Sequence, residues 1–224
     1  MTCQLGAFSS DHRGRTVMGM AYKFLDLAST PSVRAAQAAN GSREMWARVD
    51  VDRELDRFTD RERAFLAERD SFYMATVSET GWPYVQHRGG PPGFVKVLDD
   101  RTLALPDFGG NRQYISLGNL GADPRAALIF VDYPSRARMK LFVHVATRDL
   151  ASDPALAAQL ALPGYRGRPE RAFVMTLETF DWNCPQHITP RYTEHEIEEA
   201  VAPLRAQLAA LQAENAALRT AQAR

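Results

Sequence analysis

Two short segments of this sequence combine arginine with a pair of glycines: residues 88–90 read Arg-Gly-Gly, and residues 109–112 read Gly-Gly-Asn-Arg. Arginine makes charge-assisted hydrogen bonds to phosphate, and glycine lets the backbone come close to a ligand because it lacks a Cβ. Ser116 lies near the start of a predicted helix, where free N–H groups favour an anion. These residue types suit a ligand that joins a phosphate to a flat ring.

Each Gly-Gly pair alone is more typical of an ordinary turn. Each pair, however, stands beside an arginine and a predicted strand, and two such segments favour a binding site over two unrelated turns. His87 alternates with Val85 along a predicted strand, so a structural role and a ligand contact are both open for it.

The spacing of histidine and cysteine matches no familiar metal site. His87, His144 and His187 lack a known metal-ligand spacing, and the only cysteines, Cys3 and Cys184, lie far apart in the sequence. We therefore predict no metal ion and no disulfide framework, which fits a reducing compartment.

Composition limits the function classes further. A chain of 224 residues with 45% hydrophobic residues can form one domain with a real core and some extra elements. Lys plus Arg equals Asp plus Glu at 27 each, so no net field favours a nucleic acid or an acidic membrane. The sequence starts without a leader pattern and has no segment long enough to span a bilayer. We expect a soluble, cytoplasmic protein.

The local patterns predict mostly strands. Alternating hydrophobic residues predict strands at residues 72–77, 84–87, 95–98, 102–105, 126–133, 139–147 and 172–179. A capping box of Thr59 and Glu62 predicts a helix over residues 60–69, and residues 111–120 are also predicted to be helical. A weaker pattern indicates a short helix over residues 32–39. Many strands with short turns favour an antiparallel barrel or sandwich.

Residues 193–224 differ in character from the rest. Thr193 and Glu196 form a second capping box, which predicts the start of a long helix. Along it, spacings of four and three residues separate Ile197, Val201, Leu204, Leu208, Leu211, Asn215 and Leu218. This heptad pattern, with Asn215 at an a position, predicts a parallel two-stranded coiled coil. The alternative is a helix lying on its own core, and Pro203 opposes a coil that begins before it.

Three segments carry a family resemblance: QHRGGPPGF, then ALPDFGGNRQYISLGNLGADPRAALIFVD, and finally FDWNCPQHITPR. Together they resemble the split-barrel flavoproteins of the pyridoxamine 5′-phosphate oxidase family, over roughly residues 58–192. The resemblance implies a mainly β fold, an antiparallel six-stranded FMN-binding split barrel with flanking helices. It also implies an obligate homodimer with FMN at the subunit interface. Residues 1–57 are then an N-terminal extension, and residues 193–224 are an appended amphipathic helix.

The resemblance also implies roles for individual residues. The FMN phosphate would be bound by Arg88 and Arg112, with additional hydrogen bonds from Asn111 and Ser116. The edge of the flavin ring would be lined by Gln86, His87, Pro106 and Asp107. A segment that approaches from the partner chain or closes over the flavin contains Trp182, Asn183, Gln186 and Arg191. Asn119 is a further candidate, with helix capping as its alternative role.

The function predicted on this basis is an FMN-dependent oxidoreductase, in which the cofactor does the redox chemistry. No catalytic residue is assigned, and the substrate is undetermined; a small molecule or NAD(P)H is compatible with the sequence. True pyridoxamine-phosphate oxidases end in an Arg-x-His-type segment that grips the substrate phosphate. This chain has WNCPQHITPRYT instead, so oxidation of a vitamin B6 phosphate is not expected.

Two alternatives stay open. One is a flavin-binding or sensing dimer without turnover, because no acid or base is obvious near the ring. The other keeps the fold but binds haem or a deazaflavin, and a haem would need an axial ligand such as His87, His144 or His187.

Overall fold

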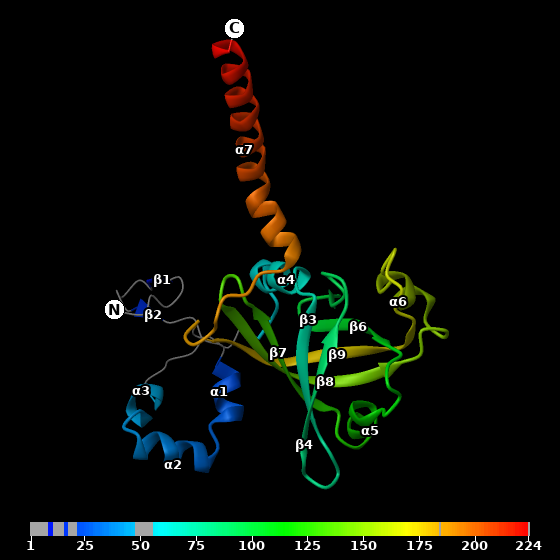
Figure 1. Cartoon of the computed structure of the whole chain (residues 1–224). Coiled ribbons are helices and arrows are strands. Elements are labelled where there is room, and N and C mark those ends of the chain that lie inside the picture. Colours follow the sequence, from blue (N-terminus) through cyan, green and yellow to red (C-terminus); the bar gives the residue numbers. More distant parts are fainter. Residues whose placement is uncertain (1–8, 11–15, 18–21, 48–55, 184, 224) are drawn as a thin grey trace. The chain divides into compact units, whose positions relative to one another are not determined.

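The computed structural model describes residues 9–10, 16–17, 22–47, 56–183 and 185–223. The chain divides into two compact units (Figure 1). The barrel unit contains residues up to Asp132 together with Ala137–Pro185. The C-terminal unit contains Tyr133–Arg136 and Gln186–Arg224.

A single antiparallel sheet forms the centre of the barrel unit. Its strands, in spatial order, are β4 (Pro83–Gly89), β3 (Ser71–Val77), β7 (Arg125–Asp132), β8 (Ala137–Arg148), β9 (Pro169–Asn183), β6 (Thr102–Phe108) and β5 (Lys96–Val97). All seven predicted strand segments are confirmed. The sheet described here therefore has seven strands, and the count of six is wrong; β5, only two residues long, pairs with β6 through Lys96 and Ala104.

Alternation along the strands places one face of the sheet in the core. On β3 the side chains of Phe72 and Met74 are buried, whereas Tyr73 between them is exposed. Phe72 stacks on Phe130 of β7 with 4.7 Å between the ring centroids. Because successive side chains of a strand point to opposite faces, this pattern fixes which face each strand turns inward.

Helices flank the sheet. The predicted helix after Thr59 is α4 (Asp60–Ala67), where Glu62 accepts a hydrogen bond from the Thr59 backbone N–H at 3.0 Å. The short helix predicted over residues 32–39 is α2 (Pro31–Ala39). Three helices were not predicted: α1 (Tyr22–Ala28), α3 (Arg43–Ala47) and α6 (Pro154–Gln159). A two-stranded ribbon, β1 (Ser9–Ser10) and β2 (Thr16–Val17), precedes α1.

The helix predicted over residues 111–120 begins later than expected. It is α5 (Ile115–Ala122), and residues 111–114 form a loop before it. Arg112 and Tyr114 in this loop have positive φ angles of 61° and 53°, which an α-helix does not allow. The loop therefore presents its backbone differently from a first helical turn.

Part of the N-terminal segment is attached to the sheet. Phe24 of α1 is buried and stacks on Phe142 of β8, with centroids 4.6 Å apart. Lys23 pairs with Glu178 of β9 at 2.7 Å. Helix α1 thus packs on the β8–β9 pair, so residues 1–57 include an element of the barrel unit.

The C-terminal unit is dominated by one long helix, α7 (Glu194–Gln222). Its predicted capping box is confirmed, because Glu196 accepts the Thr193 backbone N–H at 2.7 Å and Thr193 caps the Glu196 N–H. Pro203 lies inside the helix, and no described residue of α7 is buried. Among the described residues, no helix is both long and apolar enough to cross a membrane.

Candidate ligand-binding cavity

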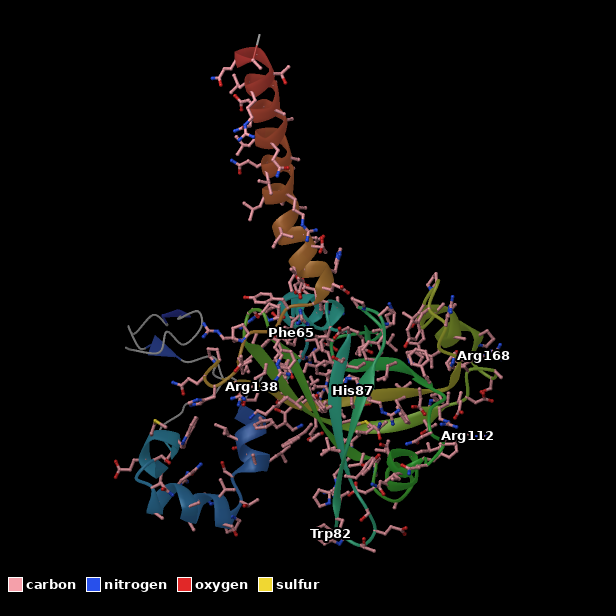
Figure 2. All side chains as sticks on the ribbon, viewed as in Figure 1. Phe65, Trp82, His87, Arg112, Arg138 and Arg168 are labelled. Atoms are coloured by element: carbon pink, nitrogen blue, oxygen red, sulfur yellow. The ribbon has the colours of Figure 1, made fainter. Side chains whose placement is uncertain are left out.

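The barrel unit contains a cavity of about 290 Å³ beside β4 and β6. It is lined by β4, by β6, by the loop that precedes α5, and by the first turn of α5, with Phe94 and Glu170 completing the wall. Four strands separate β4 from β6 in the sheet order. An ion pair between Arg88 of β4 and Asp107 of β6 nevertheless joins them, so the sheet curls far enough for side chains of these two strands to touch. Figure 2 labels His87 and Arg112, which lie on two of these elements.

A buried carboxylate organises the inner wall of the cavity. Asp107 is only 6% exposed and accepts hydrogen bonds from two guanidinium groups, those of Arg88 and Arg171, the latter at 2.8 Å. Arg88 also lies over the ring of Phe173, 5.1 Å from its centroid. One carboxylate therefore holds two arginines that belong to different strands, β4 and β9.

Arg88 keeps unused hydrogen-bonding capacity in this arrangement. Its Nε atom is buried and has no hydrogen-bond partner among the described residues. A buried donor without a partner costs about 1–3 kcal/mol, so such a group calls for an acceptor such as a water, an ion or a ligand. Since Arg88 lines the cavity, an acceptor bound there is the simplest partner for it.

The charge of Arg171 is stabilised in place. Burial lowers the pKa of its guanidinium, but the hydrogen bond and charge of Asp107, together with Glu170, outweigh burial and raise that pKa above its usual value. Glu170 accepts a second hydrogen bond from Arg171 at 2.9 Å. The Arg171 guanidinium therefore keeps its positive charge beside Asp107.

The loop before α5 carries backbone strain. Arg112 and Tyr114 both adopt the left-handed conformation, which costs on the order of 1–3 kcal/mol for a residue other than glycine. Two hydrogen bonds hold the loop. Within the loop, the Asn111 side chain accepts the Gln113 N–H at 3.1 Å, and from the loop to β9 the Tyr114 hydroxyl donates to Glu170 at 3.3 Å. A hydrogen bond to Tyr114, and the charges of Tyr114 and Glu170, raise the pKa of the exposed Arg112. Strain of this kind gathers at ligand-binding loops.

The first turn of α5 offers backbone donors to the cavity. Its N-cap, Tyr114, makes no side-chain capping bond, although capping residues normally satisfy one of the free N–H groups there. Ser116 in the same turn is 4% exposed and lines the cavity. An uncapped helix N-terminus beside arginines is suited to an anion.

Glycine is present at positions 90 and 110 for different structural reasons. A Cβ on Gly90 would lie 2.7 Å from the Phe94 Cβ, so this glycine is required by packing. A Cβ on Gly110 would meet no atom within 4 Å, and this residue borders the cavity. Of these two glycines, Gly110 therefore fits the expectation that glycine keeps space open for a ligand.

The cavity brings together eight of the predicted site residues: Gln86, His87, Arg88, Pro106, Asp107, Asn111, Arg112 and Ser116. They come from β4, from β6, and from the segment around the start of α5. Their roles in binding stay predictions, but their convergence is a fact of the fold.

The other predicted residues lie outside the wall of this cavity. Asn119 donates to the Thr76 hydroxyl at 3.0 Å and ties α5 to β3. Trp182 donates from Nε1 to Glu62 at 2.8 Å and packs its ring edge-on against Phe65 of α4. Asn183 pairs with Arg138 in the β8–β9 register.

Two predicted residues belong to the C-terminal unit. Gln186 is exposed, and the guanidinium of Arg191 lies over the ring of Tyr133, 5.0 Å from its centroid. Of the alternative haem ligands, His187 is also in this unit, whereas His144 lies on β8 at 3.6 Å from Glu178. Only His87 among the three lines the cavity.

Sequence reasoning missed several residues of the site. Tyr84, Phe94, Tyr114 and Glu170 line the cavity, and Arg171 holds Asp107. Glu170 and Arg171 escaped notice because β9 begins at Pro169, ahead of the predicted strand at 172. Their charges directly before an apolar strand were the one available signal.

A comparison with known protein families shows which family this chain belongs to. Residues 58–179, more than half of the sequence, match the profile of the pyridoxamine 5′-phosphate oxidase family. The chain belongs to the pyridoxamine 5′-phosphate oxidase family. The strands of the split barrel and all eight cavity residues named above fall inside the matched segment or at its edge, so the cavity belongs to the family domain.

Solved structures with related folds have low sequence identity to this family member. An FMN-binding protein from Syntrophomonas wolfei is 15% identical, with 65% of this chain and 96% of that chain covered and a TM-score of 0.44. A protein related to general stress protein 26, from Clostridium acetobutylicum, is 16% identical, with 66% and 99% covered and a TM-score of 0.42. An F420 reductase is 17% identical, with 53% and 94% covered and a TM-score of 0.38. No curated protein matches the sequence.

Proposed function

We propose that this protein binds FMN in the cavity between β4, β6 and α5 and acts as an FMN-dependent oxidoreductase. The observation that carries the proposal is the unpartnered, buried Nε of Arg88 in the cavity wall. A phosphate oxygen is an acceptor of the right charge for it.

The phosphate end of FMN would lie where Arg88, Arg112 and the first turn of α5 converge. Arg88 supplies Nε, Arg112 supplies an exposed guanidinium, and the uncapped N-terminus of α5 supplies backbone N–H groups. Asp107 acts through Arg88, because the ion pair between them fixes the guanidinium in place. Asn111 shapes the loop by accepting the Gln113 N–H, and Ser116 lies at the helix start.

Charge alone would not select the ligand. The positive charges of Arg88 and Arg112 in the cavity equal in number the negative charges of Asp107 and Glu170. Arg171, which pairs with Asp107, makes the net charge of this group of side chains positive. Specificity for a phosphate must therefore come from directed donors.

The ring of the flavin would lie along β4 and β6. Leu105 and Pro106 supply apolar surface, while Gln86 and His87 supply polar edges. Tyr84 donates its hydroxyl proton to the Gln86 side-chain oxygen, and the Gln86 amide nitrogen donates to the His87 carbonyl at 3.3 Å, so both ends of this side chain are held in place. When bound, FMN supplies hydride transfer at its N5 atom, and the residues named here bind and orient it. A small molecule or NAD(P)H is the proposed reaction partner.

The active form is proposed to be a homodimer with FMN at the subunit interface. The outer face of the β3–β4 hairpin, next to the cavity, exposes large apolar side chains: Tyr73, Val77, Trp82 and Val85. Trp82 is 76% exposed at the turn of this hairpin (Figure 2). A cluster of this kind is typical of a surface that another protein covers. In such a dimer, Trp182, Asn183, Gln186 and Arg191 would approach the flavin bound by the partner chain.

An absorption spectrum of the purified protein tests the proposal first. Flavin bands, and release of about one FMN per chain on denaturation, are the expected results. A Soret band would instead indicate haem with His87 as the candidate axial ligand, and the absorption band of a deazaflavin would indicate that cofactor in place of FMN. A colourless protein that ignores added FMN would overturn the proposal.

Two further measurements refine it. Titration with riboflavin, which lacks the phosphate, should give an affinity about 100-fold below that for FMN if the arginines bind the phosphate. Anaerobic mixing with NADH or NADPH then separates an oxidoreductase, whose flavin is bleached, from a flavin-binding protein without turnover.

A further inference from the structure

Helix α7 carries a stripe of exposed apolar side chains along one face. Ile197, Leu204, Leu208, Leu211 and Leu218 have exposed fractions between 49% and 65%. Together with the half-buried Val201, these side chains form the seam of α7. An ordinary surface helix turns its leucines inward, so a seam this exposed calls for a partner.

The sequence of the seam suits a second copy of the same helix. With Leu204, Leu211 and Leu218 at d positions, Val201, Leu208 and Asn215 fall at a positions. An asparagine at a favours two parallel strands in register, because its polar side chain can then meet its equivalent. Glu214 at g would face Arg219 at e of the other copy, so the charges are complementary as well.

Pro203 leaves the part of α7 that follows it able to pair. It lies at a c position, on the side of α7 that faces away from the seam. A proline inside a helix removes one backbone hydrogen bond and kinks the axis, so regular pairing is expected only after it. The part of the helix after Pro203 still carries most of the seam.

We propose that α7 pairs with α7 of a second copy as a parallel, in-register coiled coil, within the same two chains that form the barrel homodimer. The stripe from Val201 to Leu218 covers only about two and a half heptads, which is marginal for independent pairing. Association through the barrels raises the effective concentration of the helices to the order of millimolar. The inference thus rests on the proposed homodimer.

Cysteine cross-linking in the full chain tests the pairing. Leu211→Cys is introduced after Cys3→Ser and Cys184→Ser, and Ala213→Cys at an f position serves as the matched control. A parallel, in-register pair places equivalent d positions within disulfide range, while f positions point outward. Under mild oxidation the cross-link at 211 should form at least about tenfold faster than that at 213. Equal rates, or no cross-link at 211, would overturn the proposal.

Sedimentation of the uncross-linked protein tests whether the same two chains are involved. A mass of two chains, unchanged after cross-linking, is expected; a mass of four would mean that α7 joins separate barrel dimers and would overturn that part. The FMN content of the same samples keeps the two proposals apart. One FMN per chain with no cross-link at 211 removes only the helix pairing, and a full cross-link without FMN removes only the cofactor.

Discussion

The cavity of the barrel unit and the seam of α7 present their side chains in opposite ways. The cavity gathers residues from β4, β6, β9 and the start of α5, and it buries charged groups such as Asp107. The seam takes all its residues from one regular helix and leaves them exposed. The first depends on how the sheet curls, and the second depends only on a helical period.

This contrast explains where each region departs from ideal local structure. The cavity contains two residues in left-handed backbone and an arginine nitrogen that no described residue of the chain accepts a hydrogen bond from. Such features cost free energy and persist because the surrounding fold holds them. Apart from Pro203, α7 obeys the rules for a stable helix, including a complete capping box. We therefore expect mutations in the cavity to change ligand affinity and mutations in the seam to change self-association.

The largest effect is expected from Arg88→Ala. Loss of charge-assisted hydrogen bonds worth about 1.5–3 kcal/mol should weaken FMN binding about 100-fold, as followed by quenching of flavin fluorescence. Arg88→Lys should recover part of the affinity. Arg125→Ala is the matched control, because Arg125 is exposed and pairs only locally, with Asp123. An affinity unchanged in Arg88→Ala would break the assignment of the cavity.

The two glycine pairs should separate stability from binding. Gly90→Ala places a methyl group 2.7 Å from the Phe94 Cβ, and overpacking of this kind should lower the free energy of unfolding by about 2 kcal/mol in urea denaturation. Gly110→Ala meets open space and should leave unfolding unchanged. If it also leaves the FMN affinity unchanged, the ligand does not approach this part of the backbone.

A substitution that relieves backbone strain in the loop before α5 should raise the stability of the protein and lower its affinity for FMN. Arg112 has φ 61°, and Arg112→Gly removes the penalty of that conformation together with the guanidinium. We expect the melting temperature of the ligand-free protein to rise by about 2 °C, and the FMN affinity to fall about tenfold. A rise in both quantities would show that Arg112 does not contact the ligand.

The smallest effect is expected in the seam. Asn215→Val replaces a polar a-position residue by an apolar one, which should strengthen α7 pairing by about 1 kcal/mol while loosening the preference for two parallel strands. The FMN affinity should not change. Thermal melting at 222 nm and sedimentation measure the pairing. A change in flavin affinity would show that the seam and the cavity are energetically coupled and would contradict their independence.

The sequence alone anticipated the elements that depend on neighbours in the chain. Both capping boxes form as expected, at Thr59 and Thr193. The strand segments are correct because alternation reports burial on one face, whatever the strand order. The short helices α1 and α6 were missed, since neither has a pattern long enough to stand out; α1 is held by Phe24 on Phe142.

Resemblance of the motifs to a family anticipated eight residues of the cavity, but not their geometry. Asp107 was assigned to the ring edge, whereas its carboxylate holds Arg88 and Arg171. Trp182 was assigned to the flavin segment, and within its own chain it packs against α4 through Glu62 and Phe65. These contacts join residues that are far apart in sequence, which local patterns do not report.

The strands, the two capped helices and the heptad pattern of α7 follow from the sequence, because each depends on periodicity or on contacts within a few residues. The tertiary structure alone decided that β4 meets β6 across four intervening strands, and that one buried carboxylate then bridges Arg88 and Arg171. Curling of a sheet is a sum of small twists over all its strands, so no single segment of the chain encodes which residues will face each other across the cavity.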